Sequence, residues 1–272
     1  MNYRHAFHAG NFADCMKHAL LVWLLQALAR KDKPFFVLDT HAGAGHYDLQ
    51  ADSARRTGEA ERGILRLLDG TPAELTSYVD VVRQLGLYPG SPALIRAMLR
   101  PADRLACCEL HDQDAADLRR LFARDPGVAV HRRDAWEALG ALLPPKETRA
   151  LILIDPPYES PDEFSRLAKG LAVGHARFKT GVFAAWYPIK HRAPVRSFLA
   201  TMLASGIRDI MTAELLLREP LDPTRLNGCG LLVINPPYRF QQEATTILHA
   251  LLGRLGQDEP GASVVIQRVT DE

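Results

Sequence analysis

The stretch DPPY at residues 155–158 carries side chains that could act on an amino group. The exocyclic amino group of a nucleobase is a poor nucleophile, because its lone pair is delocalised into the ring. The carboxylate of Asp155 and the carbonyl of Pro156 can accept its two N–H bonds and draw the nitrogen toward tetrahedral geometry. Pro156 and Pro157 fix φ at about −65° and make the turn rigid, and Tyr158 can stack on the base. The stretch therefore predicts a catalytic site for transfer to an amino nitrogen, unless the prolines only end a strand.

A glycine-rich turn and two acids also follow apolar runs. The turn is DTHAGAG at 39–45, and Glu109 and Asp134 end the next two runs. Gly43 and Gly45 allow close approach of a ligand, Glu109 could accept both ribose hydroxyls of an adenosine, and Asp134 could meet an adenine edge. Each feature alone is more often structural, but the series predicts an adenosine-containing cofactor. No phosphate-binding lysine follows the glycines and no full GxGxxG is present, which favours S-adenosylmethionine over a dinucleotide.

The N-terminal segment 2–18 is rich in aromatic, basic and histidine side chains, which are Tyr3, Arg4, His5, His8, Lys17 and His18. This mixture suits contact with a nucleic acid. A metal site is the weaker interpretation, because no carboxylate or thiol spacing accompanies the histidines. An ordinary polar arm is the remaining alternative.

A second candidate for nucleic-acid contact is the segment 175–208, which holds six basic residues and no Asp or Glu. The six are Arg177, Lys179, Lys190, Arg192, Arg196 and Arg208. Trp186 and Tyr187 lie in the same segment, at the end of an apolar run that faces the proposed site. Phosphate contact is the favoured interpretation, and a solvated basic face is the alternative.

Apolar runs alternate with helical patterns along much of the chain. The runs lie at 35–40, 105–110, 128–133, 150–155 and 180–186, and the helical patterns lie at 11–31, 111–124, 135–143 and 162–178. This alternation predicts an α/β fold with a doubly wound parallel sheet, whose site lies at the carboxyl ends of the strands. The runs 209–217 and 231–235 are joined by a loop too short for a crossover helix. The last of these seven strands should therefore run antiparallel to the rest.

The interval 48–100 interrupts this alternation with helical patterns at 58–69, 73–85 and 92–100. We interpret it as a helical subdomain inserted after the first strand of a single domain that spans 1–272. A lid or substrate platform over the site and an elaboration without a role are both compatible with the pattern.

The stretch LLVINPPYRF at 231–240 nearly repeats LILIDPPYES at 151–160. Because the strand at 231–235 is predicted to be antiparallel, Asn235 to Tyr238 should emerge at the edge of the sheet opposite to the site. The NPPY stretch is therefore predicted to end a strand and to take no part in the chemistry.

The amino-acid composition limits which classes of protein this chain can belong to. The chain has 272 residues, 47% of them hydrophobic and 24% charged, and its net charge of +1 says little about partners. The four cysteines form no C-x-x-C pair, which favours a reduced, cytosolic protein without a structural metal. No signal peptide is apparent, and the apolar segment His18 to Ala29 is shorter than the roughly 20 residues of a membrane span. We expect a cytoplasmic protein that is not bound to a membrane.

Five stretches occur in a characteristic order: YRHAFHAGNFADCMKH, LDTHAGAGHY, YPGSP, LILIDPPYE and WYPI. In these stretches, and over essentially its whole length, the chain resembles the bacterial 23S ribosomal RNA adenine-N6 methyltransferases of the RlmJ type. The resemblance implies a Rossmann-like class I methyltransferase that uses S-adenosylmethionine to methylate N6 of one adenosine in 23S rRNA, with the target base extruded from its stack.

The resemblance also assigns roles to single residues. It implies that the cofactor lies near His18, His41, Ser91, Glu109, Asp134, Ala135 and Asp155. Asp155 would also be the catalytic acceptor, and the substrate side would hold Tyr3, His5 and Lys17, within an N-terminal motif at 1–18. The family often carries tryptophan at the position of Tyr238, so Tyr238 should not be essential.

Other functions stay open at this point. A guanine-N2 or DNA adenine-N6 methyltransferase could use the same DPPY motif, and an RNA-binding factor without catalysis could retain the scaffold. An intact Asp155 and glycine turn count against the last. Access to RNA at one exposed face is compatible with a monomer. Neither the exact nucleotide nor the state of the RNA substrate follows from the sequence.

Overall fold

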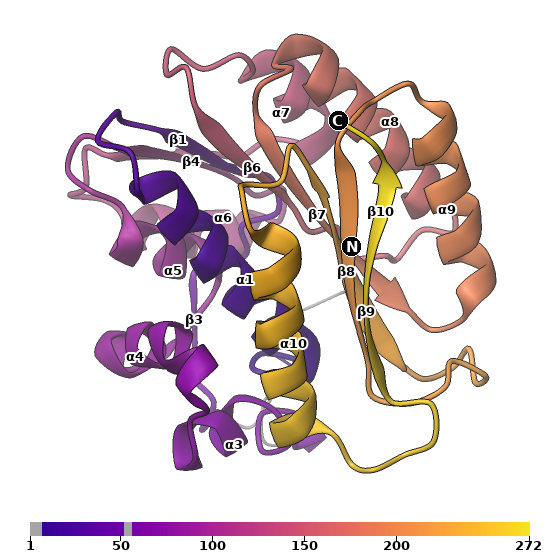
Figure 1. Ribbon diagram of the computed structural model, residues 1–272. Coiled ribbons are helices and arrows are strands. Elements are labelled where there is room, and N and C mark those ends of the chain that lie inside the picture. Colours follow the sequence, from indigo (N-terminus) through magenta and orange to yellow (C-terminus); the bar gives the residue numbers. More distant parts are fainter. Residues whose placement is uncertain (1–6, 52–55) are drawn as a thin grey trace.

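The computed structural model describes residues 7–51 and 56–272 and contains one large mixed sheet (Figure 1). The sheet has eight strands in the order β10-β8-β9-β7-β6-β1-β4-β5. The strands are β1 (Phe36–Asp39), β4 (Arg104–Cys108), β5 (Val128–His131), β6 (Ala150–Ile154), β7 (Val182–Ile189), β8 (Ile210–Leu216), β9 (Gly228–Ile234) and β10 (Ser263–Thr270). The α/β class, the seven predicted strands and their mostly parallel arrangement are confirmed.

The strand count was wrong by one. The strands β1, β4, β5, β6 and β7 pair in parallel, and β9 pairs antiparallel with both β7 and β8 as predicted. The additional strand, β10, pairs antiparallel with β8 at the edge of the sheet. Its sequence SVVIQRVT is only partly buried, so it lacks the continuous apolar run that marks a central strand.

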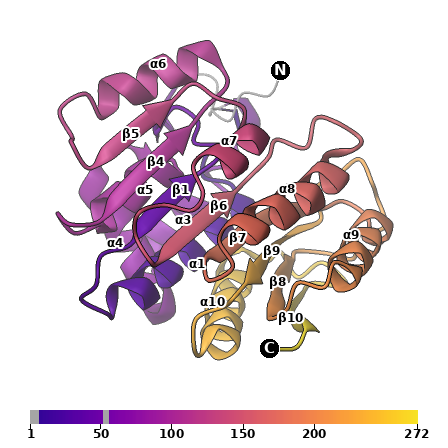
Figure 2. The ribbon, with the colours of Figure 1, turned by 90° about the horizontal axis from the view of Figure 1, so that it is seen from above.

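Helices cover both faces of the sheet (Figures 1 and 2). One face packs against α1 (Phe12–Ala29), α5 (Ser91–Met98), α6 (Asp112–Leu121) and α10 (Phe240–Leu255). The other packs against α7 (Ala135–Ala141), α8 (Glu163–Arg177) and α9 (Arg192–Ala204). Alternate residues of a strand enter opposite cores: in β6, Leu151 and Leu153 join the first core, and Ile152 and Ile154 join the second. This period of two explains why β6 is apolar throughout.

The helix α1 begins at an asparagine cap, since Asn11 Oδ1 accepts a hydrogen bond from the Asp14 N–H at 2.9 Å. Its length and mean hydropathy of 1.3 would suffice to cross a membrane, but 78% of it is buried within the fold. A core helix of a globular protein has the same composition, so α1 gives only weak evidence for a membrane span.

The interval 48–100 is largely helical, with α3 (Ile64–Asp69), a 3-10 turn η2 (Ala73–Leu75), α4 (Thr76–Leu85) and α5. A short antiparallel pair, β2 (His46–Tyr47) with β3 (Tyr88–Pro89), brings the two ends of the excursion together. The helix α5 packs against α1, β1 and β4 and so belongs to the layer that covers the sheet. A separate insertion would therefore end before Ser91, and the division of the chain into domains stays a prediction.

The two Pro-Pro stretches lie at opposite ends of the strands: DPPY lies at the edge where the parallel strands end, and NPPY lies at the edge where they begin. Asp155 follows β6 at its carboxyl end, beside the turn after β1. Asn235 follows β9, where Ile234 pairs with Phe183 near the start of β7, and its side-chain amide donates to the carbonyls of Lys179 and Gly181, each at 2.8 Å. The position expected for NPPY is thus confirmed.

Candidate active site

A cavity of about 1090 Å³ opens at the carboxyl edge of the parallel strands. It is bordered by α1, by the turn after β1, by the beginning of α5 and by residues that follow β4, β5, β6, β7 and β8. Its lining includes Lys17, His18, His41, Gly43, Ser91, Glu109, Asp134, Ala135, Asp155, Pro156, Pro157 and Tyr158. The fold therefore gathers the predicted site residues at one place. Tyr3 and His5 lie outside the described residues.

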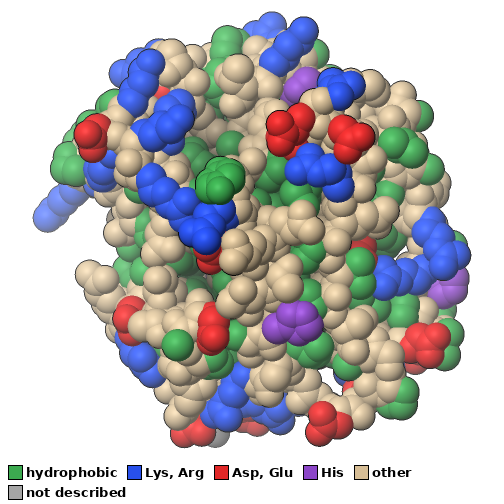
Figure 3. Space-filling view, viewed as in Figure 1, with side chains coloured by type: hydrophobic (Ala, Val, Ile, Leu, Met, Phe, Trp, Pro, Cys, Tyr) green, Lys and Arg blue, Asp and Glu red, His purple; other side chains and the backbone are tan. Residues whose placement is uncertain are grey.

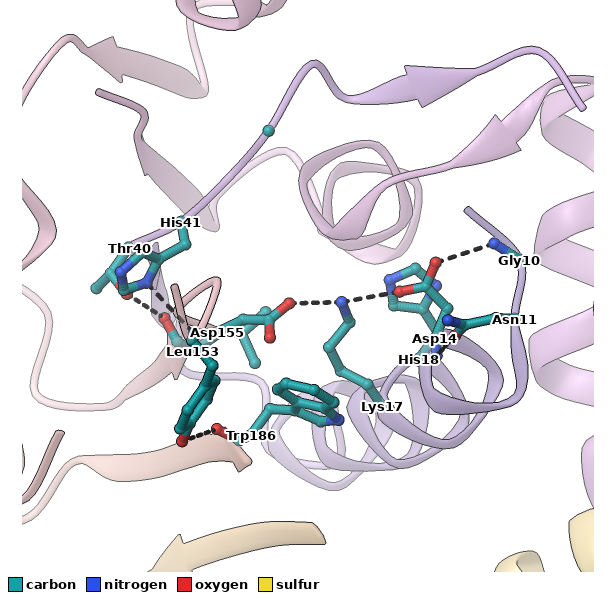
Figure 4. Close-up of polar contacts among 12 residues, drawn as sticks. Gly10, Asn11, Asp14, Lys17, His18, Thr40, His41, Leu153, Asp155 and Trp186 are labelled. Atoms are coloured by element: carbon teal, nitrogen blue, oxygen red, sulfur yellow. Dashed lines mark hydrogen bonds and ion pairs between the residues drawn. The ribbon is translucent and has the colours of Figure 1, made fainter. Parts of the chain in front are cut away.

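Three charged side chains that line the cavity, Asp14, Lys17 and Asp155, are joined in a chain of polar contacts (Figure 4). Lys17 extends from α1, and its Nζ donates to Asp155 Oδ2 at 2.5 Å and to Asp14 Oδ1 at 3.0 Å. Asp14 in turn accepts the Gly10 N–H at 3.0 Å. Burial disfavours the Lys17 ammonium, but Asp155 and Asp14 outweigh burial and raise the pKa of Lys17 well above its usual value. Lys17 is therefore a fixed cation that orients the Asp155 carboxylate.

His41, which also lines the cavity, contacts the backbone of Asp155. The Asp155 N–H donates to His41 Nδ1 at 3.3 Å, and the His41 ring packs edge-on against Trp136 at 5.5 Å between centroids. Burial, with a smaller effect of Arg166, lowers the pKa of His41 to about 3. A neutral imidazole can accept the Asp155 N–H, so His41 fixes the backbone at which the DPPY turn begins.

Tyr158 is held among aromatic rings. Its hydroxyl donates to the Trp186 carbonyl at 3.1 Å, and its ring meets those of Phe164 and Trp186 at 5.0 and 5.8 Å between centroids. Its backbone is left-handed, with φ of 52°, which is uncommon for a residue other than glycine. The turn after Asp155 is thus fixed by packing at Tyr158 as well as by the two prolines.

Glu109 joins the glycine turn to the end of β4. Its Oε2 accepts the Gly43 N–H at 2.8 Å and its Oε1 accepts the His111 N–H at 2.7 Å. Gly43 has φ of +64°, and a Cβ there would lie 2.4 Å from the Tyr47 hydroxyl oxygen. Burial raises the pKa of Glu109, while the two backbone N–H groups oppose that rise. The carboxylate is therefore held rigidly at the cavity wall.

Asp134 has a structural role in addition to its place in the cavity. Its Oδ1 accepts the N–H groups of Trp136 and Glu137 at 2.9 and 3.2 Å and so caps α7. Its Oδ2 lies 3.9 Å from Arg166, whose guanidinium also lies over the Trp136 ring. An aspartate at this position is accordingly explained in part by the helix that follows it.

Two acids were missed by the sequence analysis: Asp39, which directly precedes the lining residue Thr40, and Asp14, which lines the cavity. Asp39 ends β1 and is fully buried, and neither of its oxygens has a hydrogen-bond partner among the described residues. Burial raises its pKa to about 7, although Ser91 is near enough to oppose the rise. The second is Asp14, which pairs with Lys17. The sequence did contain a signal for each acid. Asp39 begins DTHAGAG, and Asp14 precedes Lys17 by three residues on one helix face.

The segment 175–208 does not form one basic surface. Arg177, Lys179 and Arg208 lie near the starts of β7 and β8, at the edge opposite to the cavity, whereas Lys190 lines the cavity. Arg192 pairs with the buried Glu214 at 2.5 Å. Figure 3 likewise shows basic and acidic side chains interspersed over the face it presents. The prediction of a single phosphate-binding face was wrong, because a segment that crosses the sheet contributes charges to both edges.

The sequence model of the family described as "Ribosomal RNA large subunit methyltransferase D, RlmJ" matches residues 32–267. The chain belongs to this family. It is 42% identical over 263 residues to Ribosomal RNA large subunit methyltransferase J of Escherichia coli, with 94% of each chain covered. It is 38% identical to the protein of that name from Haemophilus influenzae, with both chains covered in full. Membership confirms the family expected from the five sequence stretches.

A solved structure supports the fold of this family member. A protein from Legionella pneumophila shares 37% sequence identity and a TM-score of 0.86, with 96% of this chain and 98% of that chain covered. Among the described residues, no group of three or more His, Cys, Asp or Glu side chains is placed to hold a metal ion. The roles of single residues in this ribosomal RNA methyltransferase fold stay predictions.

Proposed function

We propose that this protein transfers a methyl group from S-adenosylmethionine to the N6 amino group of an adenosine in 23S ribosomal RNA. The proposal is carried by one observation, the Asp155 carboxylate fixed by Lys17 inside a cavity that also holds Tyr158 and Glu109. Family membership supports the ribosomal RNA as the class of substrate.

The acceptor groups around Glu109 fit the proposed cofactor. Glu109 presents a carboxylate held by two backbone N–H groups, which suits the ribose hydroxyls of an adenosine. Asp39, which precedes the lining residue Thr40 and is close to Ser91, has a buried carboxyl without a hydrogen-bond partner in the described part of the chain. His18, His41, Asp134 and Ala135 complete the proposed set. When bound, S-adenosylmethionine would supply an electrophilic methyl group there.

At the other end, the protein's task is to position an amino nitrogen. Lys17 occupies Oδ2 of Asp155, which leaves Oδ1 to accept one N–H of the adenine amino group. The Pro156 carbonyl can accept the second, since a proline carbonyl in a rigid turn has a fixed direction. Tyr158 offers a ring on which the extruded base can stack. Catalysis then consists mainly of orientation, with the nitrogen held about 3–3.5 Å from the reacting carbon.

The remaining parts of the proposal concern the N-terminal substrate contacts, the oligomeric state, the location in the cell and the need for a metal. Tyr3 and His5, in the N-terminal motif 1–18, would contact the substrate beside Lys17. We expect one domain that acts as a monomer in the cytoplasm and needs no metal ion.

The test compares ribosomal RNA from cells with and without this protein by nucleoside mass spectrometry. We expect loss of one N6-methyladenosine, restored by the wild-type protein and not by Asp155→Ala. The lost mark is then mapped to its nucleotide. Loss of N2-methylguanosine instead would support a guanine-N2 methyltransferase. An unchanged nucleoside profile together with retained RNA binding would support a factor without catalysis.

A further inference from the structure

Three exposed basic residues lie where the cavity meets the solvent. Arg62, Lys190 and Arg225 line the cavity and are exposed, which places them where it meets the surface. They come from three separate segments: the interval between β2 and α3, the end of β7, and the loop between β8 and β9. We call these three residues the basic rim. Their convergence is not visible in any one stretch of sequence.

Two acids near the basic rim are already engaged with other side chains. Glu59 accepts hydrogen bonds from His8 and Asn11, each at 2.9 Å. Glu259 pairs with Arg218 at 2.7 Å and reaches Arg225 only at 3.6 Å. The loop at 217–227 also carries Glu219 and Asp222, but of its charged side chains only the two arginines, Arg218 and Arg225, line the cavity, so the charge it presents to the cavity is positive.

Among the three cations of the basic rim, Lys190 has the side chain with the fewest polar contacts to the protein. In residues 7–51 and 56–272, its ammonium group makes no ion pair or side-chain hydrogen bond, and only its backbone carbonyl is engaged, by Asn227. An exposed ammonium at the mouth of a cavity can bind an anion without first breaking a protein contact.

A buried asparagine joins two of the three segments that form the basic rim. Asn227 is fully buried, and its Nδ2 donates to the carbonyls of Lys190 at 2.8 Å and Asp222 at 2.7 Å. Its backbone N–H donates to the Ile189 carbonyl at 3.1 Å. One side chain thus fixes the end of β7 to the loop that carries Arg225. The spacing of Lys190 and Arg225 is therefore set by the fold, as a binding surface requires.

We propose that the basic rim binds the phosphodiester backbone of the RNA on either side of the extruded nucleotide. This inference rests on the proposed function. A base that enters the cavity brings its flanking phosphates to the mouth, where arginine forks and a lysine match phosphate oxygens. Such contacts position the strand and do not read its sequence.

The experiment measures binding of a 23S rRNA transcript over a range of salt concentrations. The test variant is Lys190→Gln with Arg225→Gln. The matched control is Lys179→Gln with Arg196→Gln, which removes the same two charge types from residues that do not line the cavity. Loss of two phosphate contacts should lower the slope of log K against log salt by about 1.4, at about 0.7 per contact for a single strand. Affinity at low salt should fall about tenfold or more, and KM for RNA should rise accordingly.

Three outcomes would overturn the proposal: an unchanged salt slope in the test variant, an equal loss in the control, or a loss of binding to poly-L-glutamate but not to RNA. The last would assign the rim to an acidic protein partner. Thermal unfolding of both variants checks that the fold is intact. The nucleoside identity of the product is read separately, so a failure of the adenine-N6 assignment leaves the salt result interpretable.

Discussion

The stretches DPPY and NPPY differ in one letter and in almost every physical respect. Asp155 follows a strand that runs with its parallel neighbours and meets the charged Lys17 in a cavity. Asn235 follows a strand that runs the other way, and its amide donates to two backbone carbonyls at the opposite edge. Tyr158 is packed among aromatic rings, whereas Tyr238 is 87% exposed. The direction of the strand decides whether the same turn faces the cavity or only the protein's own backbone.

The side-chain type agrees with each setting. Asn235 is neutral and has left-handed backbone with φ of 54°, which asparagine tolerates better than most residues. Its two donated hydrogen bonds satisfy carbonyls that precede β7. An aspartate there would offer only acceptors to those carbonyls. At Asp155 the requirement is reversed, because Lys17 needs an anion and the proposed amino substrate needs an acceptor.

The largest predicted difference is between Asp155→Ala and Asn235→Ala. Removal of the Asp155 acceptor should lower methyl transfer to ribosomal RNA by about a thousandfold or more, which corresponds to about 4 kcal/mol of barrier. Asn235→Ala should leave transfer within about threefold of wild type but destabilise the fold by about 1–3 kcal/mol, because two carbonyls lose their partner. Single-turnover rates and chemical denaturation of both variants provide the measurements.

A control separates chemistry from folding in that comparison. The Asp155→Ala protein should still bind S-adenosylhomocysteine, as isothermal titration can show, because Glu109 and the glycine turn are untouched. Near-normal transfer by Asp155→Ala would remove the basis for the proposed function. A large loss of rate in a folded Asn235→Ala protein would mean that the two edges are not independent.

The sequence was sufficient for the central part of the fold. Buried strands such as 150–154 are apolar throughout, so the parallel sheet and its carboxyl edge followed from periodicity and connection length. The edge strand β10 was not predicted, because a half-exposed strand with Gln267 and Arg268 lacks that signal. The antiparallel direction of β9 was predictable, because the connecting loop is too short for a crossover.

Side-chain partners were less predictable than positions. The resemblance placed Lys17 on the substrate side, but only the structure shows its bond to Asp155, which is 138 residues away in sequence. The prediction of one phosphate-binding face from the basic segment 175–208 was wrong, because linear composition does not tell which edge of a sheet a residue occupies. The basic rim was missed for the same reason, since Arg62 and Arg225 are far apart in the chain.

The second predicted difference concerns buried acids at the two edges. Asp39, at the carboxyl edge, has its pKa raised by burial from 3.8 to about 7. Asp103, at the opposite edge, is also buried, but hydrogen bonds from Arg100 and the Phe35 N–H outweigh burial and lower its pKa. The two acids should therefore give the folding stability opposite dependences on pH.

The signs follow from proton binding. Between pH 3.8 and about 7, folded Asp39 keeps a proton that the unfolded chain has lost, so its contribution to stability falls as pH rises. The contribution of Asp103 is present above its unfolded pKa and is lost as pH falls through the lower folded value. In chemical denaturation between pH 4.5 and 8, the free energy of unfolding of the wild-type protein should include a decline on the order of 1–4 kcal/mol that Asp39→Asn removes. Asp103→Asn should instead destabilise the fold across this whole range. A wild-type protein whose stability rises steadily through pH 7, with no change in Asp39→Asn, would contradict the assignment.

The smallest predicted difference lies between the two tyrosines. Tyr158→Phe removes one hydrogen bond, that to the Trp186 carbonyl at 3.1 Å, and keeps the ring. The lost hydrogen bond should weaken the positioning of the ring by about 1 kcal/mol. If the ring is the stacking surface, KM for RNA should rise several-fold. Tyr238→Phe makes the same chemical change at a side chain that is 87% exposed and should alter neither KM nor stability measurably. Steady-state kinetics of the pair decides the point: equal effects would mean that the hydroxyl matters for a reason unrelated to the cavity. An effect confined to Tyr158 would extend the distinction between the two edges from the charged residue to the aromatic one.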